Sequence, residues 1–304
     1  MRFCRFGDNR LGLVEGTTVR DVTTALDVLP ACRYPLPTHD ILVANLEHVA
    51  ERAREIAPKS PSLPLAGLKL LSPVANPGKI VAAPVNYKKH AQEVKDNVAL
   101  HNNNPALLQS IQTIGLFLKA TSSLVGAGEG IRLRNPDRRN DHEVELAFVI
   151  GKEASNVPRS AALDYVAGYA IGLDITIRGT EDRSFRKSPD TYSVLGPWLV
   201  TPDEIGDPGN LDLSISVNHE VRQKSNTNNM ILGVAELIEL ASSFYTLYPG
   251  DIVMTGTPEG VSQIAPGDVI SATVEKVGTM QVLVAQASWP VAAPPEKAAA
   301  GQKP

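Results

Sequence analysis

Apolar and polar residues alternate in short runs along much of the chain, which is the pattern of β-strands. Near the N-terminus, residues 2–6 and 11–15 form two such runs around a Gly-Asp-Asn turn and predict a hairpin, with a further strand near residues 17–22. Asp40 then precedes a helical pattern in residues 41–50 and is placed to cap it. These elements predict a small N-terminal α/β unit.

A proline-rich stretch at residues 58–64 separates this unit from the rest of the chain. Beyond residue 78, short β-type runs are divided by Gly, Pro and Asn, and helical patterns are few, chiefly residues 160–164 and 234–244. The last residues are rich in Ala, Pro and Lys, a composition that does not build a core. We therefore expect a mainly β, α+β protein. Its predicted parts are a small N-terminal domain in residues 1–70, a larger catalytic domain in residues 71–288 and a flexible tail in residues 289–304.

Composition and charge exclude several classes of protein. The chain has 304 residues, of which 43% are hydrophobic, and its net charge of -4 comes from basic and acidic residues mixed without a basic stripe, so nucleic acid is not an expected partner. No apolar run approaches the roughly 20 residues that span a bilayer. Cys4 and Cys32 lack the spacing of a disulfide framework or a thiolate metal site. We expect a cytoplasmic protein without membrane partners.

Three acidic residues interrupt strongly apolar runs: Glu143, Glu145 and Asp174. A buried carboxylate is costly unless positive charge lies against it. Glu143 and Glu145 are two residues apart on a predicted strand, so they face the same way and repel one another. Two explanations remain open: a buried Arg or Lys, of which Arg178 is the nearest in sequence, or a bound metal, which we favour. A set of oxygen ligands suits Mg²⁺, with Mn²⁺ and Ca²⁺ as alternatives.

Two other segments contain residues that are suited to catalysis or binding. His90 and Glu93 are spaced i and i+3, so a helical turn would place them on one face. A carboxylate that accepts one ring N–H leaves the other ring nitrogen free to take a proton from water. Residues 249–260 read as a turn, a strand and a glycine-bearing loop, where backbone N–H groups and Thr257 would approach a carboxylate. Each pattern alone also fits a structure without function: a solvated helix face for His90 and Glu93, and an ordinary strand and turn for residues 249–260.

Basic residues follow Asp174 closely. Strand parity places Arg178 on the same face as Asp174, where an anionic substrate would dock. Arg183 and Arg186 are expected to be solvated loop charges.

Taken together and in order, these segments resemble the fumarylacetoacetate hydrolase family over about residues 78–287. The matching pieces are Asn86-Tyr-x-x-His90-x-x-Glu93, Phe117-Leu-Lys119, Glu143-Val-Glu145, Asp174-x-x-x-Arg178, Lys187-Ser-x-Asp-Thr-Tyr and Thr255-Gly-Thr-Pro258. The resemblance implies the family's mixed β-roll or sandwich, a homodimer, a divalent ion that is usually Mg²⁺, and a small anionic 2-oxo-acid substrate. The site residues that it implies are the metal ligands Glu143, Glu145 and Asp174, the catalytic His90, Glu93 and Lys187, and the substrate-binding Arg178, Lys119 and Thr257.

The activity that the resemblance implies is metal-dependent hydrolysis of a carbon–carbon bond in an acylpyruvate or related 2,4-dioxo acid, in the catabolism of aromatic compounds. Relatives decarboxylate, hydrate or tautomerise 2-oxo acids at the same kind of site, which is the second hypothesis. A binding protein that has lost the chemistry is the third. The chain departs from many relatives at Gly179 and Glu181, and its stretch between Arg178 and Lys187 is short. We therefore expect the distal end of the substrate to be recognised differently here.

Overall fold

The structure, a computed structural model, describes residues 1–101 and 105–287. Its central element is a 12-stranded mixed sheet, in which β5 (Leu70–Leu71) pairs with β1 and β8 (Leu124–Val125) pairs with β14 beside the main path. The order of the main path is β4 (Ser62–Pro64), β3 (Thr18–Asp21), β2 (Arg10–Glu15), β1 (Arg2–Phe6), β14 (Ser193–Val200), β12 (Val166–Asp174), β11 (Val144–Ile150), β17 (Ile252–Met254), β6 (Ile80–Ala82) and β7 (Phe117–Lys119).

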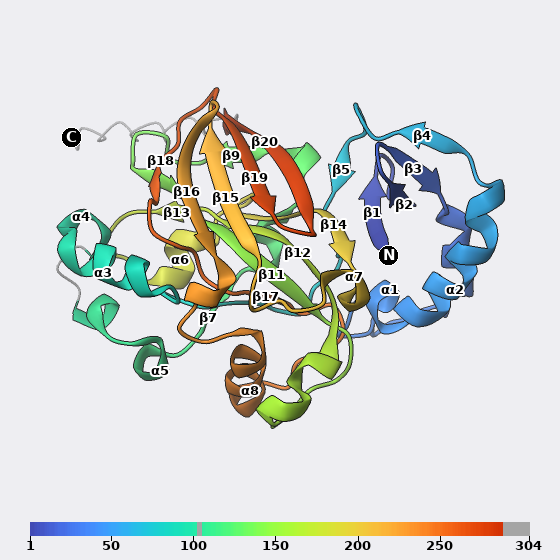
Figure 1. Cartoon of the computed structure of the whole chain (residues 1–304), viewed down its shortest axis with the longest axis horizontal. Helices are drawn as coiled ribbons and strands as arrows, with labels where there is room; N and C mark the ends of the chain where they lie inside the picture. The colour runs from blue at the N-terminus through green and yellow to red at the C-terminus, as the bar shows by residue number, and fades with distance from the viewer. Residues whose placement is uncertain (102–104, 288–304) are drawn as a thin grey trace, which may run out of the picture.

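Two smaller sheets complete the strand framework of the described residues. The five-stranded sheet has the order β16 (Glu220–Asn226), β15 (Asp212–Val217), β19 (Val269–Val274), β20 (Gly278–Gln286) and β9 (Ile131–Leu133). The three-stranded sheet has the order β13 (Thr176–Ile177), β10 (Asn140–His142) and β18 (Ser262–Gln263). The predicted α+β class with more strand than helix is confirmed (Figure 1).

The N-terminal unit contains the predicted hairpin, β1 and β2, and lies at one end of the molecule (Figure 1). Asp40 caps the predicted helix, accepting a hydrogen bond of 3.0 Å from the Val43 N–H; the helix is broken into α1 (Ile41–Ala44) and α2 (Leu46–Ile56). Strand β1 also pairs with β14, so the first strands continue the central sheet. The domain boundary near residue 70 stays a prediction, and the predicted tail lies outside the described residues.

Strands β11 and β12 are buried on both faces, which explains why their sequences are almost continuously apolar. On β11, Leu146 and Phe148 belong to the main core cluster, whereas Ala147 and Val149 belong to a second cluster on the opposite side. The five-stranded sheet contributes Ile215 to the same main cluster, so it packs on that face. The ends of β11 and β12 are thereby held rigidly, and these ends carry the acidic residues.

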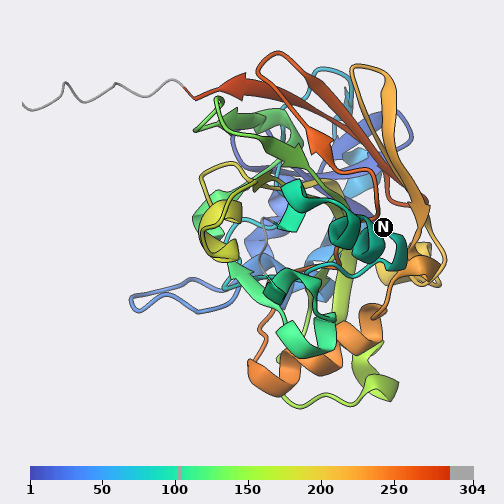
Figure 2. The ribbon, with the colours of Figure 1, turned by 90° about the vertical axis from the view of Figure 1, so that its left-hand side faces the viewer.

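Helices are few and short. The helix predicted at residues 234–244 is α8 (Val234–Phe244), and residues 159–165 form a 3₁₀ segment around the other predicted helix. No helix of the described residues is both long and apolar enough to cross a bilayer. In Figure 2, the side of the molecule facing the viewer carries α3 (Lys88–Asp96), α4 (Val98–His101) and α5 (Ile111–Ile114).

Candidate active site

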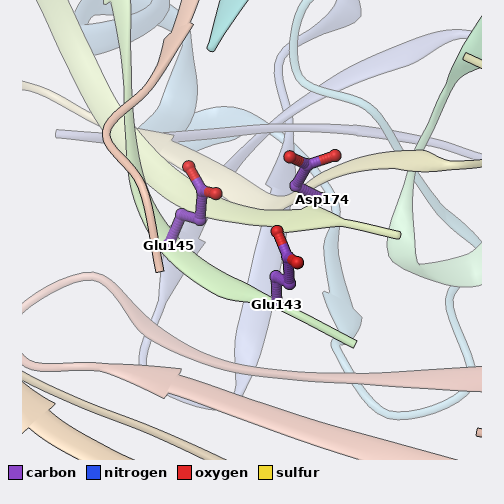
Figure 3. Close-up of side chains that lie close together, drawn as sticks. All are labelled: Glu143, Glu145 and Asp174. Carbon is purple, nitrogen blue, oxygen red and sulfur yellow. The ribbon is translucent and has the colours of Figure 1, made fainter. Parts of the chain in front are cut away.

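The three acidic residues meet where β11 and β12 lie side by side. Glu145 pairs with Gly172 across the two strands, and the Asp174 N–H donates a 3.0 Å hydrogen bond to the Glu143 carbonyl. One carboxylate oxygen from each acidic residue lies within 4.8 Å of the other two, and all three residues are at most 4% exposed. Figure 3 shows the three carboxylates turned toward one another. Strand parity predicted that Glu143 and Glu145 face the same way. The structure confirms this and adds Asp174 to the same cluster.

Two of these carboxylates also contact cationic side chains. Lys187 Nζ donates hydrogen bonds to Glu143 Oε2 at 2.6 Å and to Asp174 Oδ2 at 2.5 Å. Arg178 Nη2 donates to Glu143 Oε1 at 2.8 Å. Lys119 Nζ donates to Asp174 Oδ1 and, at 2.8 Å, to a main-chain carbonyl. The ion pairs considered as an alternative to metal are thus present for Glu143 and Asp174.

Glu145 is the exception. Its Oε2 accepts a 2.7 Å hydrogen bond from the Gly256 N–H, but no Lys, Arg or His of the described residues forms an ion pair with it. Burial, reinforced by the charge of Asp174, raises the pKa of the Glu145 carboxyl well above its ordinary value. Burial alone would raise the pKa of Glu143 too, but Lys187 and Arg178 outweigh it and hold that pKa below its ordinary value. The trio therefore still has an uncompensated carboxyl.

A divalent ion would compensate the remaining negative charge of the three carboxylates. Oxygens on an octahedral ion with bonds of about 2.1 Å lie roughly 3 to 4 Å apart, and the longer bonds of Ca²⁺ widen that spacing. The observed limit of 4.8 Å needs only a small contraction to reach it. Because the donors are all carboxylate oxygens, the set suits a hard ion. Glu143, Glu145 and Asp174 form a divalent metal site on these grounds, and the ion would supply the charge that Glu145 lacks.

His90 and Glu93 form the predicted pair on α3. His90 Nδ1 lies 2.7 Å from Glu93 Oε2, and Glu93 Oε1 accepts a 3.0 Å hydrogen bond from the Gly260 N–H. Gly260 has φ of +94°, and a Cβ there would lie 2.2 Å from the Arg222 carbonyl oxygen, so glycine is required. With Nδ1–H donated to Glu93, the free Nε2 is an acceptor.

His90 and two of the three carboxylates line one pocket. The lining includes His90, Glu143 and Glu145, together with the apolar side chains of Val94 and Leu100. Thr257 also lines it, but its hydroxyl donates 2.9 Å to the Val144 carbonyl and accepts 2.9 Å from Gln223 Nε2. Lys119 is buried behind Asp174 and is not among the residues that line the pocket.

The expectation that Arg183 and Arg186 are solvated loop charges is wrong. Both line the pocket, and Arg186 is only 5% exposed. Arg186 Nη1 and Nε donate 2.9 Å hydrogen bonds to the carbonyls of Ile177 and Glu181. The short helix α6 (Arg183–Lys187), capped by Asp182, folds this connection back toward the carboxylates. No sequence signal revealed this, because the helix is too short to show a periodicity.

The two departures from the family pattern face away from the pocket. Glu181 accepts hydrogen bonds of 2.7 and 2.9 Å from the guanidinium of Arg138, which lowers the pKa of Glu181 to about 2. Gly179 makes room for this pair, because a Cβ there would lie 2.2 Å from Arg138 Nη2. Glu181 is not among the pocket-lining residues.

Comparisons with known proteins agree with this geometry. Residues 79–285 match the family model described as fumarylacetoacetate (FAA) hydrolase C-terminal. The chain is 58% identical over 284 residues to the maleylpyruvate hydrolase of Aquipseudomonas alcaligenes, covering 93% of this chain and 99% of that protein. It is 37% identical over 244 residues to the mitochondrial oxaloacetate tautomerase of Rattus norvegicus, covering 76% of this chain and 74% of the other.

A solved structure is similar over nearly the whole chain. The maleylpyruvate hydrolase of Sphingobium sp. SYK-6, in complex with manganese(II) ion and pyruvate, superimposes with a TM-score of 0.80 at 38% identity, covering 95% of this chain and all of that one. Because the matched family region spans most of the sequence and contains the carboxylate trio and the His90–Glu93 pair, the chain belongs to the fumarylacetoacetate hydrolase family.

Proposed function

We propose that this protein is a divalent-metal-dependent hydrolase that cleaves a carbon–carbon bond in an acylpyruvate of the maleylpyruvate type, in the catabolism of aromatic compounds. The observation that carries the proposal is that His90, which is held by Glu93, lines the same pocket as Glu143 and Glu145 of the carboxylate trio. The near full-length similarity to a maleylpyruvate hydrolase supports the choice of substrate class.

Glu143, Glu145 and Asp174 would hold the ion, which we infer to be Mg²⁺ or Mn²⁺ because the manganese complex of the Sphingobium enzyme has the same fold. When bound, the ion acts as a Lewis acid that stabilises negative charge on the 2-oxo oxygen of the pyruvate part. Lys119 would hold Asp174 in place, because its ammonium donates hydrogen bonds to Asp174 and to a main-chain carbonyl. We thus assign Lys119 a supporting role rather than direct contact with the substrate.

His90 would act as the general base. Its Nε2 takes a proton from water while Glu93, itself fixed by the Gly260 N–H, stabilises the imidazolium that forms. The resulting hydroxide attacks the carbonyl carbon farther from the carboxylate of the pyruvate part. The bond between that carbon and the methylene breaks, releasing a carboxylic acid and the enolate of pyruvate, which takes up a proton.

Lys187 and Arg178 would hold the oxo-acid end of the substrate. Both side chains line the pocket and already contact the Glu143 carboxylate, so an arriving oxo acid would share their N–H groups. The Thr257 hydroxyl already has hydrogen-bond partners within the protein. We therefore infer that Thr257 forms part of the pocket wall and fixes its loop to the Val144 carbonyl, without donating to the substrate.

Parallel assays of maleylpyruvate, acetylpyruvate and oxaloacetate, with Mg²⁺, Mn²⁺ or EDTA, would test the proposal. We expect hydrolysis of acylpyruvates that EDTA abolishes and either ion restores. Turnover that persists in EDTA would remove the metal mechanism. The similarity to an oxaloacetate tautomerase favours tautomerisation as the second candidate, and turnover of oxaloacetate without cleavage of any acylpyruvate would select it.

A further inference from the structure

The pocket carries more positive charge than the metal ligands require. Four cationic residues line it, Arg178, Arg183, Arg186 and Lys187, whereas the metal ligands are three carboxylates, Glu143 and Glu145 in the lining and Asp174 beside it. A divalent ion on the carboxylate trio would add further positive charge. The site as a whole therefore calls for an anion with more than one negative charge.

Of the four cations that line the pocket, Arg183 is the one whose side chain has no hydrogen-bond partner among the described residues. Lys187 and Arg178 are bonded to carboxylates, and Arg186 donates to two main-chain carbonyls through Nε and Nη1. Within residues 1–101 and 105–287, the guanidinium of Arg183 forms neither a hydrogen bond nor an ion pair, and it lies 5.2 Å from the centre of the Phe117 ring. The ring gives the guanidinium a flat surface to lie against while its N–H groups stay free.

The surroundings of Arg183 make this arrangement unfavourable without a ligand. Burial, together with the charge of neighbouring Arg186, lowers the pKa of Arg183. The charges of nearby carboxylates, of which Asp182 contributes most, oppose this lowering without outweighing it. Asp182 caps α6, and Glu181 is paired with Arg138. A half-buried guanidinium with free N–H groups, facing a pocket, suits a carboxylate bound through two hydrogen bonds.

We propose that Arg183, assisted by Arg186 Nη2, which has no hydrogen-bond partner among the described residues, binds a second carboxylate of the substrate, at the end away from the 2-oxo acid. This inference rests on the proposed function for the oxo-acid end. The pyruvate part is already provided for by the metal site, Lys187 and Arg178, so Arg183 is left for the acyl part. The protein would thus select acylpyruvates whose acyl group ends in a carboxylate.

Binding without turnover tests the inference directly. The probes are 2-oxoadipate and 2-oxohexanoate, six-carbon 2-oxo acids that differ in a terminal carboxylate or methyl group, titrated calorimetrically into the Mn²⁺-loaded full chain. The wild type should prefer the dianion, and Arg183→Gln should reduce the ratio of the two affinities by about 10- to 100-fold, the size of a lost charged hydrogen-bond pair. Arg183→Lys, which keeps the charge but loses the planar fork, should fall between. Arg132→Gln, an exposed arginine outside the pocket, is the matched control and should keep the wild-type ratio.

Kinetics give a second readout. The ratio of kcat/KM for maleylpyruvate to that for acetylpyruvate should fall by a similar factor in Arg183→Gln. An unchanged ratio, with or without an equal loss of activity on both substrates, would overturn the inference. Arg183 would then bind the pyruvate part that both substrates share, or would not contact the substrate. Binding of 2-oxohexanoate shows whether the variant is folded. If the wild type cleaved neither acylpyruvate, the proposed hydrolase function would fail, and the affinity ratio for the two oxo acids would still decide the role of Arg183.

Discussion

Lys187 Nζ lies 2.6 Å from Glu143 Oε2, so an ammonium group and the proposed divalent ion share one carboxylate. The same ammonium reaches Asp174 at 2.5 Å. The site is therefore not a simple acidic cluster. It is a set of carboxylates already partly neutralised, in which Glu145 alone has no cationic partner among the residues that the structure describes. This arrangement leads to specific expectations.

Replacing Lys187 should separate metal affinity from activity. In Lys187→Met the carboxylates lose a positive neighbour, so Mn²⁺ should bind more tightly, by about tenfold, since close charges interact strongly in a buried site. Turnover should nevertheless fall by about 100-fold or more, because a group that holds the oxo acid is lost. Calorimetry and steady-state kinetics measure the two effects, with exposed Lys152→Met as the control. Weaker metal binding in Lys187→Met would contradict the shared-carboxylate arrangement.

Glu145→Gln should remove the metal site without harming the metal-free fold. We expect Mn²⁺ affinity to fall by more than about 100-fold, beyond the effect of changing a supporting residue. In EDTA the raised pKa of Glu145 means that the folded state opposes ionisation, so wild-type stability is lost as pH rises above the ordinary carboxyl pKa of 4.5. The neutral Gln is free of this loss, so its advantage in unfolding free energy should grow from pH 5 to pH 8. An advantage that shrinks over this range would refute the raised pKa.

His90→Ala should keep Mn²⁺ affinity and lower kcat by about 10² to 10⁴-fold, the usual contribution of a general base. Glu93→Gln should give a smaller loss, because the imidazole remains but the charge that stabilises its protonated form is gone. Metal titrations alongside kinetics check both variants. Full activity of His90→Ala would show that another group activates water.

Two buried tyrosines should respond oppositely to loss of the hydroxyl. Tyr87 is fully buried, and its hydroxyl has no hydrogen-bond partner in the part of the chain that the structure describes, so Tyr87→Phe should be neutral or stabilise the fold by about 1 kcal/mol. Tyr192 donates a 2.7 Å hydrogen bond to Asn140 Oδ1, and Tyr192→Phe should cost about 1 to 3 kcal/mol by leaving that acceptor unpaired. Urea unfolding of the metal-free variants compares them. Equal losses would show that the Tyr87 hydroxyl has a partner.

The two cysteines should differ sharply in reactivity. Cys32 is exposed, whereas Cys4 is buried and its burial raises the pKa of the thiol to about 12. At pH 8 a disulfide reagent should therefore modify one thiol per native chain and two after unfolding in guanidinium chloride. Native Cys32→Ser should react with none, and rapid reaction of that variant would place Cys4 at the surface.

Local periodicity accounts for the features that the sequence predicted well. The N-terminal hairpin, the Asp40 cap and α8 depend on neighbouring residues alone, as does the pairing of His90 with Glu93 across one helical turn. The common orientation of Glu143 and Glu145 follows from strand parity in the same way. A pattern of two or 3.6 residues determines these relations without any distant contact.

The charge balance of the pocket depended on the tertiary structure. Whether a cation meets Glu143, and whether Arg183 and Arg186 face solvent or the pocket, depends on how the connection from Arg178 to Lys187 folds back. That path is set by a five-residue helix and by an Arg138–Glu181 pair 43 residues apart in sequence. Periodicity gives no information about contacts of this kind, because electrostatic partners are chosen by distance in space. The sequence by itself therefore determined which groups bear the chemistry, and only the tertiary structure decided which charges were already neutralised and which remained for a ligand.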